Sequence, residues 1–279
     1  MSEPRLILSG LAYVESPRWH DGRLWFAHWG TDDVIAVDLD GNSEVVAHGP
    51  GGLGWSIGWL PDGRLLTTGE GLVRLEPDGS RVPHADLGHL AGDWNEVVVD
   101  GRGNLYVNGG LFGPMDGGPS GVIALVTPDC EVRQVADGLA FPNGMVVTPD
   151  NRTLIVGESW AEQLTAYDIA DDGSLAGRRV WAATPGDHPD GICLDADGAV
   201  WYADVGNGHC RRIREGGEVV DTVALDRGAF ACMLGGPDGR TLFILAAEWR
   251  GFEHAEEAMA DRTGQVLVAD APAPRAGWP

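Results

Sequence analysis

Four oxygen-bearing side chains occupy equivalent places in a repeated sequence pattern. They stand six or seven residues before a turn residue and are Glu15, Asn95, Asn143 and Asp190. The two remaining equivalent places hold Trp55 or Ser56 and Ala231 or Cys232, and none of the six holds Lys, Arg or His. Two carboxylates and two amides directed at one point would repel or stay unsatisfied unless a cation lay between them. The pattern therefore predicts a site for one divalent cation.

The chemistry of the four side chains narrows the choice of cation. Oxygen ligands suit Ca²⁺, Mg²⁺ or Mn²⁺ better than a softer metal, although Zn²⁺ also accepts carboxylates. We expect Ca²⁺ and keep the other three as alternatives. Asn143-Gly144 and Asp190-Gly191 are also common turn dipeptides, and either one alone favours a simple turn. The agreement among four equivalent positions favours the cation.

The turns that define these places belong to a unit that repeats six times. Its copies begin at Asp21, Asp62, Arg102, Asp150, Asp197 and Asp238, with spacings of 41, 40, 48, 47 and 41 residues. Asp-Gly and Asn-type turns between short apolar runs predict β-hairpins. A unit of roughly 40 to 50 residues with about four strands is typical of a propeller blade. The sequence therefore predicts an all-β, six-bladed β-propeller with a central metal channel, in which the innermost strands bring the four oxygen ligands to one mouth.

The repeat accounts for residues 1–279 as a single domain. The final β-type run, GQVLVAD at residues 264–270, is expected to pair with residues near Leu6 to Leu8, because a ring of blades needs its ends joined to avoid an open edge. One short helix is expected from Glu253, in EHAEEAMADR. Amphipathic helices between the strands, which a βαβ fold would need, are missing from the sequence pattern.

Composition excludes several classes of partner. All 19 basic residues are Arg, and 42 acidic residues give a formal net charge of -23. This charge repels nucleic-acid backbones and anionic membrane surfaces. No apolar run is long enough to span a bilayer, and four widely spaced cysteines form no metal or disulfide pattern. We expect no signal sequence, because the N-terminal apolar run is short and follows Glu3. We expect a cytoplasmic monomer or homodimer that binds a small molecule, with neither nucleic acid nor membrane as a partner.

Several segments resemble one enzyme family over most of the chain. The segments are ESPRWHDGRLWF, FPNGMVVTPDNRTLIVGES, HPDGICLDADGAVWYAD and ACMLGGPDGRTLF, and the likeness runs from about Glu15 to Val268. They are similar to the SMP-30/gluconolactonase/luciferin-regenerating family. The resemblance implies a six-bladed propeller that hydrolyses lactone rings with one catalytic divalent metal. It further implies that Glu15, Asn143 and Asp190 are the metal ligands and that Asn95 contacts the substrate or completes the metal shell.

One departure from the family pattern concerns the substrate. Sugar lactonases of the family carry an Arg two residues before the Asn that matches Asn95, whereas this chain has Asp93 there. A substrate like gluconolactone is therefore in doubt. Trp94, directly beside Asn95, is expected to contact the substrate, and an aromatic wall suits an apolar lactone or ester better than a sugar.

The resemblance points to Asp190 as the catalytic residue, with three chemical roles open. It could serve as a general base, as a nucleophile, or only as a ligand of a metal that activates water. The expected function is metal-dependent hydrolysis of a lactone, a carboxylic ester. The alternatives are a phosphotriesterase or paraoxonase-like esterase and a non-catalytic ligand-binding propeller with a structural calcium. Glu158 and Asp204 are interpreted as solvated loop or turn acids, and His188 as a loop histidine.

Overall fold

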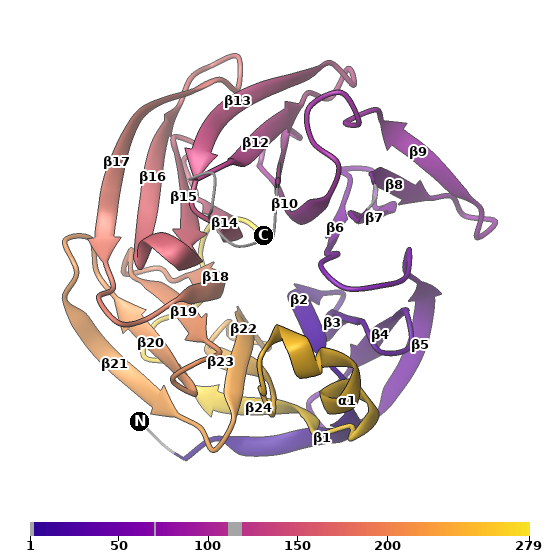
Figure 1. The fold of residues 1–279 in the computed structure, drawn as a ribbon, viewed down its shortest axis with the longest axis vertical. Helices are drawn as coiled ribbons and strands as arrows, with labels where there is room; N and C mark the ends of the chain where they lie inside the picture. The colour runs from indigo at the N-terminus through magenta and orange to yellow at the C-terminus, as the bar shows by residue number, and fades with distance from the viewer. Residues whose placement is uncertain (1–2, 70, 111–118) are drawn as a thin grey trace.

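The computed structural model describes residues 3–69, 71–110 and 119–279, and it contains six four-stranded antiparallel sheets arranged in a ring (Figure 1). Five sheets follow the chain in order. Their strands are β2 (Val14–His20), β3 (Arg23–His28), β4 (Asp33–Val37) and β5 (Ser43–His48); β6 (Ile57–Trp59), β7 (Leu65–Thr67), β8 (Leu72–Leu75) and β9 (Arg81–Ala85); β10 (Trp94–Val99), β11 (Leu105–Gly109), β12 (Gly121–Val126) and β13 (Val132–Leu139); β14 (Pro142–Val147), β15 (Thr153–Glu158), β16 (Gln163–Ile169) and β17 (Leu175–Ala183); and β18 (Pro189–Leu194), β19 (Val200–Asp204), β20 (His209–Ile213) and β21 (Val219–Ala224).

The sixth sheet joins the two ends of the chain. It combines β22 (Gly228–Gly235), β23 (Thr241–Ala247) and β24 (Gly264–Asp270) with β1 (Arg5–Leu11). Leu6 pairs with Leu267 and Leu8 with Val266, which confirms the predicted seam. The six-bladed propeller is confirmed as well, because β2, β6, β10, β14, β18 and β22 each contact the next inner strand around the ring.

The predicted turns join the innermost strand of each blade to the second strand. In several of them an Asp side chain accepts a hydrogen bond from the backbone two residues later, as Asp62 Oδ1 does from Arg64 N at 3.1 Å and Asp238 Oδ1 from Arg240 N at 3.0 Å. At Asp21 and Gly22 both φ angles are positive, at 48° and 74°, as a tight hairpin turn requires. Many acidic residues therefore have a local backbone role.

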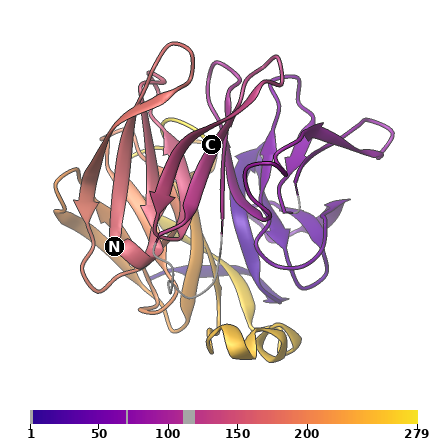
Figure 2. The ribbon, with the colours of Figure 1, turned by 45° about the horizontal axis from the view of Figure 1, so that its top comes forward.

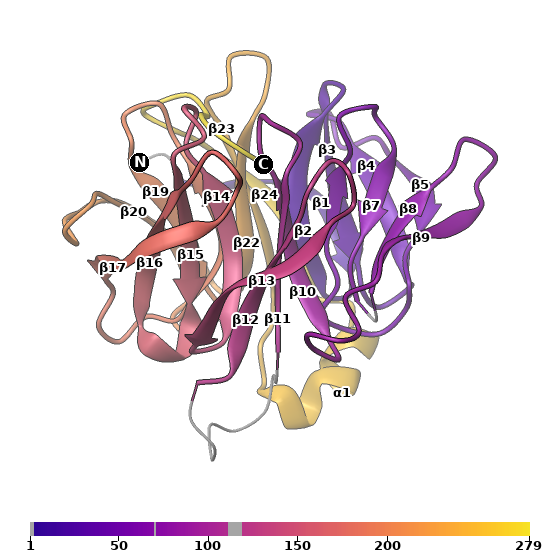
Figure 3. The ribbon, with the colours of Figure 1, turned by 90° about the horizontal axis from the view of Figure 1, so that it is seen from above.

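The two faces of the ring carry different segments. The 3₁₀ turn η2 (Phe252–His254) and helix α1 (Ala255–Ala260) lie between β23 and β24, in the region where a short helix was predicted. Figure 2 and Figure 3 show α1 projecting from one face, and the C-terminus lies toward the other. On that second face Trp278 pairs with Val147, and Arg275 with Asp195. Among the described residues, no helix has both the length and the apolar character needed to cross a membrane.

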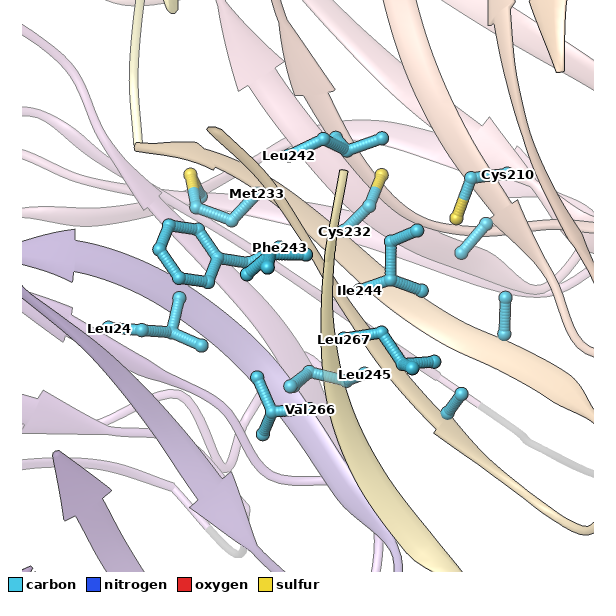
Figure 4. Packing of buried hydrophobic residues seen from close by; sticks show 14 of the residues in the cluster. Leu24, Cys210, Cys232, Met233, Leu242, Phe243, Ile244, Leu245, Val266 and Leu267 are labelled. Carbon is cyan, nitrogen blue, oxygen red and sulfur yellow. The ribbon is translucent and has the colours of Figure 1, made fainter. Parts of the chain in front are cut away.

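Apolar side chains between neighbouring blades form the core. The largest cluster joins the closing sheet to its neighbours and includes Leu24, Phe243, Ile244 and Leu267 (Figure 4). Cys193, Cys210 and Cys232 belong to the same cluster and are buried, while Cys130 is exposed. All four thiols are free. Packing between sheets, rather than within one sheet, therefore fixes the spacing of the inner strands.

Candidate metal centre

The four predicted oxygen ligands converge at one end of the inner strands. Asn95 Nδ2 donates a hydrogen bond to Asn143 Oδ1 at 3.3 Å, and the Asn143 side chain is hydrogen-bonded to Asp190. Glu15 lies close enough to Asp190 for their charges to interact. Glu15 and Asn95 are buried, with 5% and 7% of their surfaces exposed, whereas Asn143 and Asp190 are half-buried. Solvent therefore reaches the cluster at Asn143 and Asp190.

A β-bulge in each of the four strands positions these side chains. In β10, Trp94 pairs with Gly109 and Val97 pairs with Val107, so three residue steps along β10 lie opposite two along β11. Equivalent register shifts follow Glu15 in β2, Pro142 in β14 and Pro189 in β18. Asn95, Asn143 and Asp190 lie inside their bulges, and Glu15 lies at the edge of its own. A bulge interrupts side-chain alternation and re-aims the residues within it. The inner strand β6 pairs without a register shift and contributes no oxygen ligand.

The glycines that follow Asn143 and Asp190 are strand residues rather than turn residues. Neither Gly144 nor Gly191 has a positive φ. A Cβ atom added to Gly144 would lie 2.5 Å from the backbone nitrogen of Ile192, and one added to Gly191 would lie 2.4 Å from Ala231 Cβ. Glycine is required here because the next inner strand approaches so closely. The alternative of simple turn dipeptides is therefore excluded.

The electrostatics of the two carboxyl groups suit a cation. Burial raises the pKa of Glu15 well above its ordinary value, and the charges of Asp190 and Glu96 raise it further. The pKa of Asp190 is also raised well above its ordinary value, first by burial and then by the charges of Glu96 and Asp204. Neither Glu15 nor Asp190 forms an ion pair with a described residue. Two crowded carboxylates with amide oxygens beside them match the ligand chemistry of a hard divalent cation.

Sequence patterns missed a buried ion pair beneath these ligands. Arg18 Nη2 donates to Glu96 Oε2 at 2.8 Å and to the carbonyl oxygen of Val97 at 2.9 Å, and both side chains of the pair are 8% exposed. Arg18 follows Glu15 by three residues, and the bulge in β2 separates them. A strict alternation of side chains would have placed Arg18 and Glu15 on opposite faces of the strand. The pair neutralises the third acid of the centre.

Asn108 is a second residue that the sequence gave no reason to select. Its side chain is fully buried in β11 and bridges two neighbouring blades. Oδ1 accepts a hydrogen bond from Glu96 N at 3.2 Å, and Nδ2 donates to the carbonyl oxygen of Asn143 at 2.6 Å. Asn108 therefore fixes the backbone that carries Glu96 relative to the backbone that carries Asn143.

Arg18 also separates two cavities along the channel. A small cavity of about 10 Å³ is bordered by Arg18, Glu96, Gly144 and Gly191. A larger cavity of about 470 Å³ lies on the face of the C-terminal segment, and its lining includes Arg18, Trp59 and Trp278. Arg18 is common to both linings, so its guanidinium and the paired Glu96 stand between the oxygen cluster and the opposite face. A reactant would reach the cluster from the mouth at Asn143 and Asp190.

The prediction that Trp94 contacts the substrate is wrong for this structure. Its side chain has 0% exposed surface and packs among Leu66, Leu72 and Leu105. Trp94 precedes the bulge that turns Asn95 toward the channel, so the two neighbouring side chains face different surroundings. Asp93, in contrast, is exposed.

Glu158 and Asp204 are not solvated loop acids, because both are buried in strands. Glu158 is 1% exposed in β15 and accepts hydrogen bonds from Ala140 N at 2.8 Å and Arg178 Nη2 at 3.1 Å. Asp204 is 0% exposed in β19 and accepts from His188 N at 2.8 Å. Both carboxylates hold the loops that lead into β14 and β18, and they thereby support Asn143 and Asp190.

A second acidic cluster lies beside the centre. Oxygen or nitrogen atoms of Asp187, Asp204 and His209 all lie within 4.8 Å of one another. The same Asp187 oxygen, Oδ2, accepts hydrogen bonds from Arg211 Nη1 and from Tyr202 OH, both at 2.6 Å. Because an Arg already neutralises this carboxylate, the cluster is better explained as an ion-pair network than as a cation site.

The chain is similar in sequence to one family of known proteins. The sequence profile described as "SMP-30/Gluconolactonase/LRE-like region" matches residues 13–248. A 6-deoxy-6-sulfogluconolactonase from Pseudomonas putida is 27% identical over 173 residues, which cover 61% of this chain and 59% of that protein. Regucalcin from Xenopus laevis is 28% identical over 169 residues, which cover 56% of each chain. The alignments thus span less than two thirds of these relatives.

A solved structure shares the fold over nearly its full length. It is a regucalcin from Agrobacterium tumefaciens, described as a calcium-binding protein, with 19% identity and a TM-score of 0.79. The superposition covers 99% of this chain and 97% of that one.

Proposed function

Because the chain belongs to the SMP-30/gluconolactonase/LRE-like family, we propose that it is a divalent-metal-dependent hydrolase of lactones. One observation carries the proposal: two carboxylates that have no ion-pair partner within residues 3–69, 71–110 and 119–279 converge with two amides where their strands bulge. The relative named as a sulfogluconolactonase supports hydrolysis of a lactone ring as the reaction class. The oxygen-only ligands support Ca²⁺, with Mg²⁺, Mn²⁺ and Zn²⁺ as alternatives.

Glu15, Asn143 and Asp190 would hold the cation, and Asn95 would face the substrate or complete the ligand set. When bound, the cation would polarise the lactone carbonyl and lower the pKa of water. Ser16 N donates a hydrogen bond to Glu15 Oε2 at 2.6 Å, which orients this carboxylate. Ser16 Oγ in turn accepts from Ile57 N at 2.9 Å, which ties the bulge of β2 to β6.

Asp190 has the catalytic role in this proposal. Of the two carboxylates it is the one partly exposed at the mouth, so it can meet an attacking water or the substrate itself. The carboxylate would accept a proton from water as a general base. Direct attack on the carbonyl by Asp190 is the competing role, in which the bond to the ring oxygen breaks and a mixed anhydride forms. Hydrolysis of that anhydride at the Asp190 carboxyl carbon in ¹⁸O-labelled water would place the label in Asp190, whereas general-base hydrolysis would label only the product. Asn95 Nδ2 is an N–H donor that could bind a lactone oxygen.

Two alternatives share the same four residues. A phosphotriesterase would use the cation to polarise a phosphoryl oxygen, and a ligand-binding propeller would keep it only to hold the blades together. The partial exposure of Asn143 and Asp190 favours an enzyme over a purely structural centre, because a substrate could reach a cation held there. The free, buried thiols fit a reducing compartment, and we propose a cytoplasmic location.

The test combines metal analysis with a substrate panel. Purified protein would be dialysed against chelator, titrated with Ca²⁺ by calorimetry, and assayed on aliphatic, aromatic and sugar lactones and on paraoxon. We expect lactone hydrolysis that Ca²⁺ restores, and loss of both binding and turnover in Glu15→Gln and Asp190→Asn. Asp40→Asn, an exposed acid far from the centre, serves as the matched control. Unchanged binding and turnover in both site variants would refute the assignment, and bound metal without turnover of any substrate would support the structural alternative.

A further inference from the structure

Three aromatic side chains lie on segments that adjoin the candidate metal centre. Phe141 precedes Asn143 by two residues, and His188 precedes Asp190 by two residues. Trp160 belongs to the 3₁₀ turn η1 (Ser159–Ala161), which follows β15 directly. The ring centroids of Phe141 and Trp160 are 5.4 Å apart, and those of Trp160 and His188 are 5.6 Å apart. We call these three residues the aromatic wall.

Backbone hydrogen bonds hold the aromatic wall rigidly in place. Ser159 N donates to the carbonyl oxygen of Phe141 at 3.1 Å, and Trp160 N donates to that of Ala140 at 3.2 Å. On the other side, Ser159 Oγ donates to the carbonyl oxygen of Pro189 at 2.8 Å, and His188 Nδ1 donates to that of Ser159 at 2.9 Å. The turn η1 therefore connects the segment before Asn143 to the segment before Asp190.

Two features of the aromatic wall are energetically unfavourable for the protein alone and are explained if the wall binds a ligand. Trp160 keeps 44% of its surface exposed although its backbone is fixed, while Trp55, Trp94, Trp181 and Trp201 are buried. Phe141 has a φ of 58°, a left-handed conformation that a non-glycine residue adopts at an energetic cost and that is common near functional sites. Phe141 directly precedes β14 and His188 directly precedes β18, so the wall lies at the same end of these strands as Asn143 and Asp190.

We infer that the aromatic wall binds an apolar substituent of an uncharged lactone, and that Trp160 determines this specificity. The inference rests on the proposed lactonase function and names its substrate class. Apolar indole and phenyl faces gain free energy by covering hydrocarbon. An anionic substituent is disfavoured because the aromatic wall contains no Arg that could pair with it.

A homologous series of lactones tests the inference. γ-Butyrolactone, γ-hexalactone and γ-nonalactone share one ring and differ in alkyl length. Each methylene that the wall covers should raise kcat/KM roughly twofold to fourfold. We expect the wild-type protein to prefer γ-nonalactone to γ-butyrolactone by about tenfold or more, and to hydrolyse glucono-δ-lactone less efficiently than γ-nonalactone. In Trp160→Ala the ratio for the two γ-lactones should fall to about twofold or less, and Trp160→Phe should retain most of it.

Trp278→Ala is the matched control. Trp278 is 39% exposed, similar to Trp160, but it lies on the face of the C-terminal segment, so its removal should leave the ratio at the wild-type value. Lactone turnover with no dependence on chain length, or a dependence that Trp160→Ala preserves, would overturn the inference and leave the proposed function standing. Absence of turnover on every lactone with Ca²⁺, Mg²⁺, Mn²⁺ and Zn²⁺ each supplied in turn would refute both.

Discussion

Replacing Arg18 with Met should destabilise the protein strongly, because it leaves Glu96 charged and buried. The guanidinium donates to Glu96 Oε2 at 2.8 Å, to Val97 O at 2.9 Å and to Pro17 O at 3.0 Å. Removing one partner of a buried ion pair costs about 3–5 kcal/mol in free energy of unfolding. For a chain of this size about 2 °C of Tm corresponds to 1 kcal/mol, so the Tm should fall by about 6–10 °C.

A double-mutant cycle measured by urea unfolding checks the cause. In Arg18→Met/Glu96→Gln both charges of this pair are removed together, so the double variant should be more stable than Arg18→Met by about 1–3 kcal/mol. Arg23→Met removes an arginine from an exposed pair with Glu44 and should cost less than about 1 kcal/mol.

Calcium provides a second measurement on the same variants. Without the guanidinium, three carboxylates lie close together, so Ca²⁺ should stabilise Arg18→Met more than it stabilises the wild-type protein. The reasoning fails if Arg18→Met unfolds within 1 kcal/mol of the wild type, or if the double variant loses the sum of the two single losses. Equal stabilisation of both proteins by Ca²⁺ would mean that the cation does not bind near Glu96.

Two further predictions concern the backbone and the charge of the centre. Gly191→Ala forces a Cβ to within 2.4 Å of Ala231 Cβ, so it should lower the free energy of unfolding in urea by about 1–3 kcal/mol and weaken Ca²⁺ binding. Gly92→Ala is the control and should be neutral, because a Cβ added there meets nothing within 4 Å. The pKa values of Glu15 and Asp190 are raised above the ordinary values of 4.5 for Glu and 3.8 for Asp, so the folded chain binds protons more tightly than the unfolded chain. The metal-free protein should therefore lose stability as pH rises above about 4. The Tm difference between calcium-loaded and metal-free protein should therefore grow from pH 4 to pH 8, and a constant difference would contradict this electrostatic account.

The sequence was sufficient for the features that depend on local chemistry. Each Asp-Gly or Asn-type turn specifies its own hairpin through backbone conformation and a short side-chain hydrogen bond, so the repeat could be counted as six blades. The ring seam followed because an unpaired final strand would expose an edge. The equivalent spacing of Glu15, Asn95, Asn143 and Asp190 placed them together, since symmetry-related positions on inner strands share one channel.

Tertiary structure alone decided which neighbours of these residues face the channel. The bulges shift the alternation of side chains within β2 and β10, which turns Arg18 inward and leaves Trp94 in the core. Arg18 and Glu96 are 78 residues apart, and no local pattern indicates that they pair. Burial of Glu158 and Asp204 likewise depends on donors from other strands and loops. Turns are determined by a few adjacent residues, whereas register, burial and ion pairing result from contacts between distant segments, and those contacts exist only in the folded chain.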